Sequence, residues 1–370
     1  MRCEQLHLNS GLLISSFYFR NPMLIALSII VALALIVWAF LNFNPQFGAK
    51  VNKDLVKRYS ESPQWNGKIF ENQSETLMDI NLKTLPGLLK QQFTGRKLRS
   101  PEHALPIIPF DQEAFNQNPD KPKFIWYGHS VLLLQLNGKN LLIDPMLGPN
   151  AAPIAPFAVK RFSDNTLDII DQLPPIDMLL MTHDHYDHLD YASIKKLKSK
   201  VDTWYVALGV SRHLEAWGIP AETISEFDWW DSKTFEGIDI TFTPSRHFSG
   251  RGISDRAKCL WGGWVFKTAN HNIYWSGDSG YDEHFKEVGE RLGPFDWGFM
   301  ECGQYNELWH PIHMFPEETV QSSIDAKVNI SVPVHWGGFP LALHTWKDPI
   351  ERFTDSAKAQ DQKISTPEIG

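Results

Sequence analysis

The sequence predicts an α/β fold in which two β-sheets pack face to face, are covered by helices, and follow one N-terminal transmembrane helix. Three observations lead to this prediction. An uncharged apolar run occupies residues 23–43, short apolar strands alternate with helices in both halves of the chain after residue 123, and metal-ligand residue types follow several strand ends. Because a sheet must bury its apolar face against another layer, two sets of strands with intervening helices predict a layered sandwich.

Length and composition fit one large α/β domain with extensions. The chain has 370 residues, of which 43% are hydrophobic, and this is enough for a sizeable core. Its net charge of −8 and the lack of a basic block argue against a nucleic-acid partner. The cysteines, Cys3, Cys259 and Cys302, contain no CxxC pair, so we expect neither a disulfide framework nor cysteine-bound metal.

Residues 23–43 are long enough to cross a membrane. As a helix they would span about 30 Å, the thickness of a bilayer core. A cleaved signal peptide is the alternative, but the apolar run is longer than such peptides have, and Phe47-Gly48-Ala49 is a poor cleavage site. We therefore expect an uncleaved single-pass membrane anchor. Flanking Lys and Arg residues lean towards a cytoplasmic position for the rest of the chain but do not decide the membrane face.

The regions on either side of the span differ in kind. Residues 1–22 form an N-terminal tail, unless translation begins at Met23. Residues 44–122 are polar and contain several prolines, and we expect them to link the anchor to the main domain and to pack on its surface. Residues 123–370 form that main domain.

The main domain opens with a strand over 124–127 and a β-hairpin. Its apolar runs, 131–136 and 139–144, flank Asn137-Gly138, which is the strongest short hairpin signal because both positions tolerate positive φ. Pro316 at a first turn, followed by Glu317 and Glu318, marks the start of a later helix. The predicted helices cover 167–173, 191–200, 210–217, 282–291 and 316–326; the further strands cover 177–181, 203–208, 238–243, 261–267, 272–276, 296–300 and 330–334.

The densest group of metal-ligand residue types is Thr182-His183-Asp184-His185-Tyr186-Asp187-His188, directly after the strand over 177–181. Side chains alternate at a strand end, so His183, His185 and Asp187 can lean to the same side, and His188 follows as the chain turns. Imidazole nitrogens and carboxylate oxygens are ligands of zinc and similar divalent ions.

Later strands end near three more residues of this kind, His247, Asp278 and His335. Burying so many ionisable groups together is costly unless something positive binds them. Five histidines and two aspartates are too many for one tetrahedral zinc ion and suit two metal ions.

The order HxHxDH, a single His, Gly-Asp-Ser-Gly and a His after a strand is similar to that of the metallo-β-lactamase superfamily. Within it, residues 123–345 resemble the branch of the N-acylphosphatidylethanolamine-hydrolysing phospholipase D. The motifs that carry the closer resemblance are Gly128-His129-Ser130, Leu173-Pro174-Pro175-Ile176-Asp177, His185-Tyr186-Asp187-His188-Leu189-Asp190-Tyr191, Asp228-Trp229-Trp230, Thr243-Pro244-Ser245-Arg246-His247, Ser276-Gly277-Asp278-Ser279-Gly280-Tyr281, Gly293-Pro294-Phe295-Asp296 and Val334-His335-Trp336-Gly337.

The resemblance implies an αββα sandwich with two zinc ions per chain, and a homodimer. It assigns His183, His185 and His247 to the first zinc, and Asp187, His188 and His335 to the second, with Asp278 bridging the two. It implies that Asp144 orients a histidine ligand from outside the ligand set. His313 would lie near the substrate phosphate and act in catalysis with Asp187 and Asp278. We expect His129 and His310 to have structural or supporting roles.

The leading functional hypothesis is a membrane-anchored zinc phosphodiesterase that hydrolyses N-acylphosphatidylethanolamine to phosphatidic acid and N-acylethanolamine. A water shared by two zinc ions loses a proton near neutral pH, and the hydroxide attacks phosphorus. The first alternative keeps the metal centre but changes the substrate to a lactone, a cyclic or nucleotide phosphodiester, or a β-lactam. The second is a non-catalytic metal-binding envelope protein, which would need only four ligands around one zinc.

Overall fold

The computed structural model describes residues 22–152 and 158–370. Residues 1–21, which include Cys3 and all of the predicted tail (1–22) except Pro22, lie outside the described residues, as do residues 153–157. The chain divides into one unit that ends at Phe47 and a second, compact unit, Gly48–Gly370. In the first unit, α2 (Pro22–Phe43) is followed by the short η1 (Pro45–Phe47). No side chain of α2 is buried, and the helix is long and apolar enough to cross a membrane.

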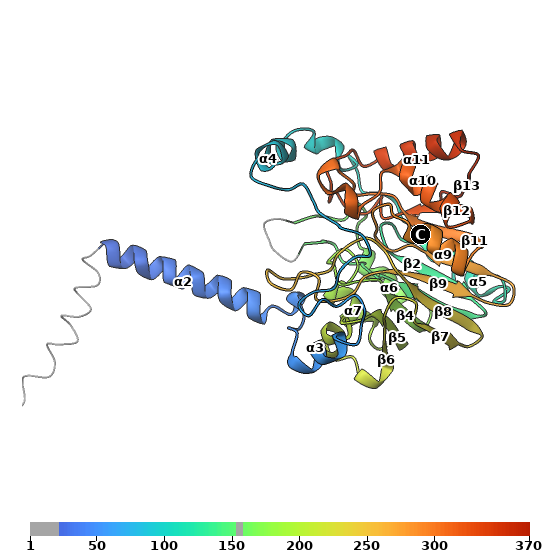
Figure 1. Ribbon diagram of the computed structural model, residues 1–370, viewed down its shortest axis with the longest axis horizontal. Coiled ribbons are helices and arrows are strands. Elements are labelled where there is room, and N and C mark those ends of the chain that lie inside the picture. Colours follow the sequence, from blue (N-terminus) through green and yellow to red (C-terminus); the bar gives the residue numbers. More distant parts are fainter. Residues whose placement is uncertain (1–21, 153–157) are drawn as a thin grey trace, which may run out of the picture. The chain divides into compact units, whose positions relative to one another are not determined.

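The second unit contains the two predicted β-sheets (Figure 1). The first has the order β1-β2-β3-β4-β5-β6, antiparallel from β1 to β3 and parallel from β3 to β6. Its strands are β1 (Lys123–Trp126), β2 (Leu132–Leu136), β3 (Lys139–Ile143), β4 (Ile176–Met181), β5 (Val201–Ala207) and β6 (Ile224–Phe227). The predicted hairpin joins β2 to β3, where Asn137 and Gly138 have φ angles of 50° and 70°, as a two-residue primed turn requires.

The second sheet has the order β13-β12-β11-β10-β9-β8-β7, antiparallel from β7 to β10 and parallel from β10 to β13. Its strands are β7 (Ser232–Phe235), β8 (Ile238–Thr243), β9 (Gly263–Lys267), β10 (Asn272–Trp275), β11 (Phe295–Glu301), β12 (Val328–Val334) and β13 (Lys363–Ile364).

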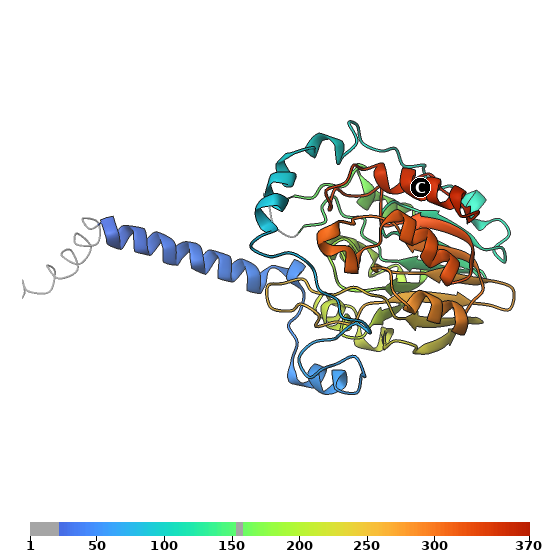
Figure 2. The ribbon, with the colours of Figure 1, turned by 45° about the horizontal axis from the view of Figure 1, so that its top comes forward.

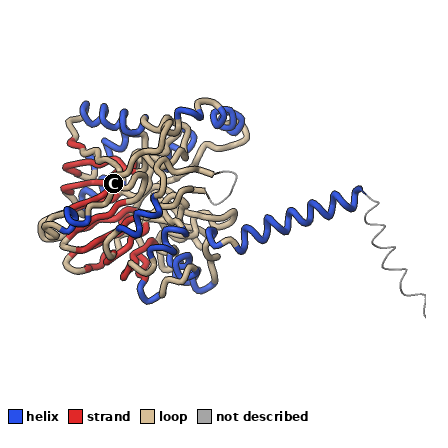
Figure 3. Tube along the Cα trace, turned by 180° about the vertical axis from the view of Figure 1, so that it is seen from behind, coloured by secondary structure: helices blue, strands red, loops and turns tan. Residues whose placement is uncertain are grey.

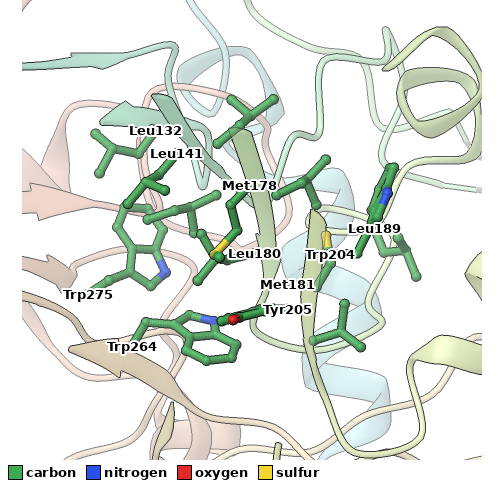
Figure 4. Close-up of a cluster of buried hydrophobic side chains, with 14 of the residues drawn as sticks. Leu132, Leu141, Met178, Leu180, Met181, Leu189, Trp204, Tyr205, Trp264 and Trp275 are labelled. Carbon is green, nitrogen blue, oxygen red and sulfur yellow. The ribbon is translucent and has the colours of Figure 1, made fainter. Parts of the chain in front are cut away.

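The core between the sheets is built from alternate residues of facing strands. Figure 4 shows Trp264 and Trp275 of the second sheet packed toward Leu132, Leu141 and Met178 of the first. These side chains are all buried, and each contributes about 1.5–3 kcal/mol on leaving water. The neighbours of the two tryptophans in sequence point to the opposite face, because successive side chains of a strand alternate.

Helices cover the outer faces of both sheets (Figures 2 and 3). On the second sheet, Val265 and Tyr274 pack with Phe285 and Val288 of α9, and α10 contacts β11, β12, α9 and α11. The described helices of the main domain are α6 (Ile169–Gln172), α7 (Tyr191–Leu197), α8 (Ser211–Ala216), α9 (His284–Arg291), α10 (Pro316–Asp325) and α11 (Asp348–Ala359), with 3-10 turns η3 (Thr166–Asp168), η4 (Ala221–Thr223) and η5 (Glu307–Ile312). The αββα sandwich is therefore confirmed.

Several elements differ from the sequence prediction. The strands β6, β7 and β13 and the helix α11 were not predicted, and the helix predicted over 191–200 ends at Leu197, since the chain must turn before β5 begins at Val201. Residues 48–122 carry α3 (Lys53–Tyr59), α4 (Leu85–Phe93), η2 (Arg96–Leu98) and α5 (Gln112–Asn116). Leu55 and Tyr59 of α3, Phe70 and Phe115 join the main hydrophobic core.

Candidate metal centre

The predicted ligands all follow the carboxyl ends of strands. His183, His185, Asp187 and His188 follow β4, and the later ligands follow β8, β10 and β12: His247, Asp278 and His335. Because β4 belongs to one sheet and the other three strands to the other, the site lies where the edges of the two packed sheets meet. The fold therefore brings together residues that are separated by up to 152 positions, from His183 to His335.

The first group contains His183, His185 and His247. His185 Nδ1 lies 2.9 Å from His183 Nε2 and 3.1 Å from His247 Nε2. His247 donates its Nδ1–H to the carbonyl oxygen of Ile312 at 3.0 Å, and His183 Nδ1 lies 2.9 Å from the Thr182 hydroxyl. These bonds fix both rings so that Nε2 faces the shared point, as metal-binding histidines require.

The second group contains Asp187, His188 and His335, with Asp278 between the two groups. His335 Nε2 lies 3.2 Å from Asp187 Oδ2 and 3.1 Å from Asp278 Oδ2. His188 Nε2 also lies 3.1 Å from Asp278 Oδ2, and His247 Nε2 of the first group lies 3.7 Å from the same oxygen. One oxygen of Asp278 therefore lies within 3.7 Å of histidines from both groups.

The imidazoles of the first group are neutral. Burial lowers the pKa of His185 to about 4 and holds the pKa values of His183 and His247 well below the ordinary value. Three nitrogen lone pairs are therefore directed at one point within the protein. Ligands about 2.0–2.1 Å from a tetrahedral zinc ion would lie about 3.4 Å apart, close to the separations found here.

The carboxylates in and around the second group stabilise positive charge on its histidines. Burial alone would lower the pKa of His188, but the carboxylates of Asp278, Asp187 and Asp144 outweigh it and raise that pKa to about 10. Burial likewise lowers the pKa of His335, but the neighbouring carboxylates outweigh it and raise that pKa. For Asp187 and Asp278, burial would raise the pKa, but the neighbouring histidines outweigh it and hold both pKa values low. Protons supply the positive charge in the metal-free protein, and a divalent cation fits the same donor set.

Asp144 holds His188 from behind. Its Oδ2 lies 2.9 Å from His188 Nδ1 and accepts from the Thr182 hydroxyl at 2.7 Å, while its Oδ1 accepts from the Thr182 backbone N–H at 2.9 Å. Asp144 is fully buried. This contact fixes the His188 ring with Nε2 toward Asp278.

Backbone conformations that side chains rarely adopt are concentrated around the site. His129, Asp144, Gln304 and His335 have φ angles of 55°, 42°, 60° and 66°, each at a cost of about 1–3 kcal/mol that the surroundings must offset. Gly277, before Asp278, has φ 63°, and a Cβ there would lie 2.3 Å from the carbonyl oxygen of Gly262. Only glycine fits at this position, so the turn that presents Asp278 depends on it.

His313 lies beside the two groups. It follows η5, its Nδ1 lies 3.0 Å from Glu301 Oε1, and its ring stacks on His335 with centroids 5.3 Å apart. It lines a cavity of about 250 Å³ together with His185, Asp187, His247, Asp278, Gln304 and His335 and an apolar wall of Met78, Ile80, Phe248, Trp309, Ile312 and Leu341. A larger hollow of about 570 Å³ near Arg58 and Glu226 contains none of the candidate ligands.

The same domain is found in known proteins. A family model described as a Beta-lactamase superfamily domain matches residues 139–336, which include all the candidate ligands. The chain belongs to the metallo-β-lactamase superfamily. Its fold is that of metal-dependent hydrolases, and the donor set above is the part of the fold that would bind the metal.

The similarity to individual relatives in the metallo-β-lactamase superfamily covers more of the chain than residues 139–336. The chain is 38% identical over 311 residues to an uncharacterized protein of Mycobacterium tuberculosis, with 83% of each chain covered. It is 29% identical over 336 residues to the N-acyl-phosphatidylethanolamine-hydrolyzing phospholipase D 1 of Caenorhabditis elegans, covering 83% of this chain and 93% of that protein. The solved structure of Igni18, a metallo hydrolase from Ignicoccus hospitalis, covers 67% of this chain and 96% of its own, with 19% identity and a TM-score of 0.53. This last likeness shows the fold.

Four residues of this metallo-β-lactamase centre were absent from the predicted ligand set. His129 Nε2 lies 2.9 Å from Asp187 Oδ2, which fits the supporting role expected of it. Thr182 connects Asp144 to His183, and Glu301 contacts His313. Asp184 Oδ1 accepts from the N–H of Gly250 at 2.6 Å, which ties the β4 loop to the His247 loop. His310 instead pairs with Glu318 at 2.8 Å and does not line the cavity.

Proposed function

We propose that this protein is a membrane-anchored dinuclear zinc phosphodiesterase of the phospholipase D type, acting on N-acylphosphatidylethanolamine. The observation that carries the proposal is the position of Asp278 between two donor groups, beside a cavity with an apolar wall. The products would be phosphatidic acid and N-acylethanolamine. The similarity to the Caenorhabditis elegans phospholipase, over nearly its whole length, supports this substrate class.

The ligand set suits a phosphodiester. His183, His185 and His247 would hold one zinc ion, Asp187, His188 and His335 the other, and Asp278 both. Two zinc ions bound there would lower the pKa of a bound water and neutralise the charge on phosphoryl oxygens. The protein's own contribution is to keep these donors rigid and correctly oriented, which Asp144, Thr182 and the Ile312 carbonyl do.

His313 is placed to contact the substrate. Its Nδ1 is engaged by Glu301, so Nε2 is the nitrogen available to the cavity that His313 lines. From there it would donate a hydrogen bond to a phosphoryl oxygen or a proton to the leaving alkoxide. A leaving N-acylethanolamine alkoxide needs such a proton, because it is a strong base.

The apolar wall suits a lipid substrate. Met78, Ile80, Trp309, Ile312 and Leu341 line the same cavity as the donors, so an acyl chain could leave the site along a non-polar surface. α2 would keep the protein at a membrane, which we propose is the bacterial inner membrane. A substrate in the bilayer and an enzyme tethered to it then meet in two dimensions rather than three.

Product analysis tests the proposal. The zinc-loaded full-length protein is incubated with a total lipid extract, and the products are identified by mass spectrometry. We expect N-acylethanolamine and phosphatidic acid from the wild type and none from His185→Ala. His310→Ala, which alters a histidine outside the cavity, is the matched control and should keep its activity. Turnover of a lactone or a soluble phosphodiester with no lipid product would favour another superfamily reaction.

A further inference from the structure

One segment of the second unit exposes an unusual amount of apolar side chain. Outside α2, eleven large hydrophobic side chains of the described residues are exposed, and six of them lie between residues 77 and 98. Leu82 is 88% exposed and Leu77 71% exposed. The others in this segment are Ile80, Leu85, Leu89 and Leu98. A soluble surface rarely gathers so many such side chains in so short a stretch.

The segment is held to the body of the unit at the metal cavity. The Asp79 N–H donates to the carbonyl oxygen of Leu308 at 2.7 Å, and the residues on either side, Met78 and Ile80, line the cavity. Thr84 Oγ1 donates to the Asp79 carbonyl at 2.8 Å, and Asn81 Nδ2 donates to the Asp79 carboxylate at 2.6 Å. This hydrogen-bonded turn holds Leu82 outward, and α4 follows it directly.

The charge of the segment is opposite to that of the chain. Between Asp79 and Glu102 there is no acidic residue, whereas the whole chain has a net charge of −8. The basic residues in this interval are Lys83, Lys90, Arg96, Lys97 and Arg99, of which only Arg99 is buried. Exposed apolar side chains interleaved with Lys and Arg are the composition of segments that lie in the interface of an anionic membrane.

We propose that residues 77–98 form a membrane-docking surface for an anionic phospholipid bilayer, and that lipid passes from it into the metal cavity beside Met78 and Ile80. The lipid-entry part rests on the proposed function, and the docking part does not. A second copy of the chain fits this surface less well, because a two-fold interface would bring the same basic side chains together. The candidate membrane span in the same chain is a further reason to expect a bilayer nearby.

A depth measurement tests the docking. Full-length protein in nanodiscs that contain anionic phospholipid carries Leu82→Cys in a Cys3→Ser background and is labelled with an environment-sensitive fluorophore; Cys259 and Cys302 are buried. We expect quenching by doxyl-labelled lipids at position 82. The control, Lys267→Cys, lies on β9, apart from α4 in Figure 1, and should not be quenched. The proposal would be overturned if both labels were equally exposed to water. It would also be overturned if the fluorophore at position 82 were quenched only by a quencher attached to a second copy of the protein and not by doxyl-labelled lipid.

A kinetic comparison tests lipid entry. Since burial of one leucine is worth about 1.5–3 kcal/mol, Leu82→Asp should lower turnover of vesicle lipid by about tenfold or more. Turnover of soluble bis(p-nitrophenyl) phosphate should not change, because Leu82 does not line the cavity. Ile324→Asp on α10 is the matched apolar-to-acid control. Unchanged vesicle turnover in Leu82→Asp contradicts lipid entry here. If the wild type releases no lipid product at all, the proposed function fails while the quenching result still decides docking.

A second inference concerns Glu301, at the end of β11. Its carboxylate is fully buried, and the ion pairs recorded for it among the described residues are with histidines. Oε1 lies 3.0 Å from His313 Nδ1 and 3.5 Å from His335 Nδ1, while Oε2 accepts from the Met314 N–H at 3.1 Å. One carboxylate therefore faces the outer nitrogen of both a candidate metal ligand and a candidate substrate-contacting histidine.

We infer that Glu301 is a positioning residue for both histidines. Glu301 Oε1 accepts from His313 Nδ1, and it lies 3.5 Å from His335 Nδ1, which has no hydrogen-bond partner among the described residues; an acceptor on this side favours the proton on Nδ1 and leaves Nε2 toward the cavity. His335 Nε2 is the atom that lies near Asp187 and Asp278. Glu301 thus links the orientation of the metal site to that of the substrate side, a role that Asp144 does not have.

Glu301→Gln tests this role, because it keeps the size of the side chain but replaces one acceptor oxygen by a donor. We expect zinc affinity, measured by competition with a chelator, to fall about tenfold, and kcat to fall without a matching rise in KM. Glu318→Gln, which alters the carboxylate partner of His310 outside the cavity, is the control. Wild-type zinc affinity and kcat in a folded Glu301→Gln protein would overturn the inference. If that variant does not fold, Glu301→Asp should give an intermediate loss, and no loss would overturn it.

Discussion

Replacing Asp144 by asparagine should weaken metal binding without removing any proposed ligand. The carboxylate takes part in three interactions: with the Thr182 N–H, the Thr182 hydroxyl and His188 Nδ1. An asparagine amide has one acceptor oxygen. If its NH₂ group replaces Oδ2, it faces His188 Nδ1 and favours the tautomer that blocks Nε2. If it replaces Oδ1, two N–H donors face each other in a buried site.

The expected magnitude follows from these contacts. A hydrogen bond to a charged group is worth about 1.5–3 kcal/mol, so zinc affinity should fall about ten- to a hundredfold. The assay is chelator competition on the full-length protein. Asp190→Asn is the matched control: Asp190 caps α7 through the Ser193 N–H at 2.8 Å, and asparagine caps equally well. Zinc affinity that is equal in Asp144→Asn and Asp190→Asn would refute the argument that Asp144 orients His188.

Two further predictions concern pH and the Asp278 turn. The raised pKa values of His188 and His335 stabilise the metal-free protein below pH about 6.5, and this stability is lost as pH rises toward 10. Zinc displaces these protons, so the rise in Tm on adding zinc should grow between pH 6.5 and 9, and a flat profile would contradict this. Gly277→Ala should lower Tm by the equivalent of about 2–4 kcal/mol, because its Cβ would strike the Gly262 carbonyl. Gly218→Ala, also at positive φ but in open space, should cost only about 1 kcal/mol, and equal losses would rule out the steric cause.

The sequence predicts the parts of this fold that depend on local pattern. The hairpin at Asn137-Gly138 and the strand over 238–243 follow from residues next to each other in the chain, and both are found. The strands β6, β7 and β13 are short, only partly buried strands at or near the edges of the sheets, so their apolar periodicity is weak. The start of α11 carries Pro349 at its first turn, a helix signal that the prediction did not use.

The candidate metal centre also contains residues that sequence pattern predicts and residues that only the folded structure reveals. The four candidate ligands after β4 form one contiguous motif, and the ends of later predicted strands add His247, Asp278 and His335, which the resemblance then assigns to the same centre. Glu301 has no comparable signal, because one glutamate after an apolar strand does not reveal what it faces. Its partners His313 and His335 are 12 and 34 residues away: His335 follows β12, which pairs with β11, whereas His313 follows η5, so both reach Glu301 only in the folded chain. The membrane-docking surface also depends on knowing which leucines the fold leaves exposed.

The most direct test of the central claim is hydrolysis of N-acylphosphatidylethanolamine in ¹⁸O-labelled water. If water attacks phosphorus beside Asp278 and the P–O bond to the ethanolamine breaks, the label enters the phosphate of phosphatidic acid. The N-acylethanolamine then keeps its original oxygen and takes up one proton. We predict one ¹⁸O per phosphatidic acid and none in N-acylethanolamine, measured by mass spectrometry. Label in the N-acylethanolamine, or no phosphatidic acid at all, would contradict the proposed reaction.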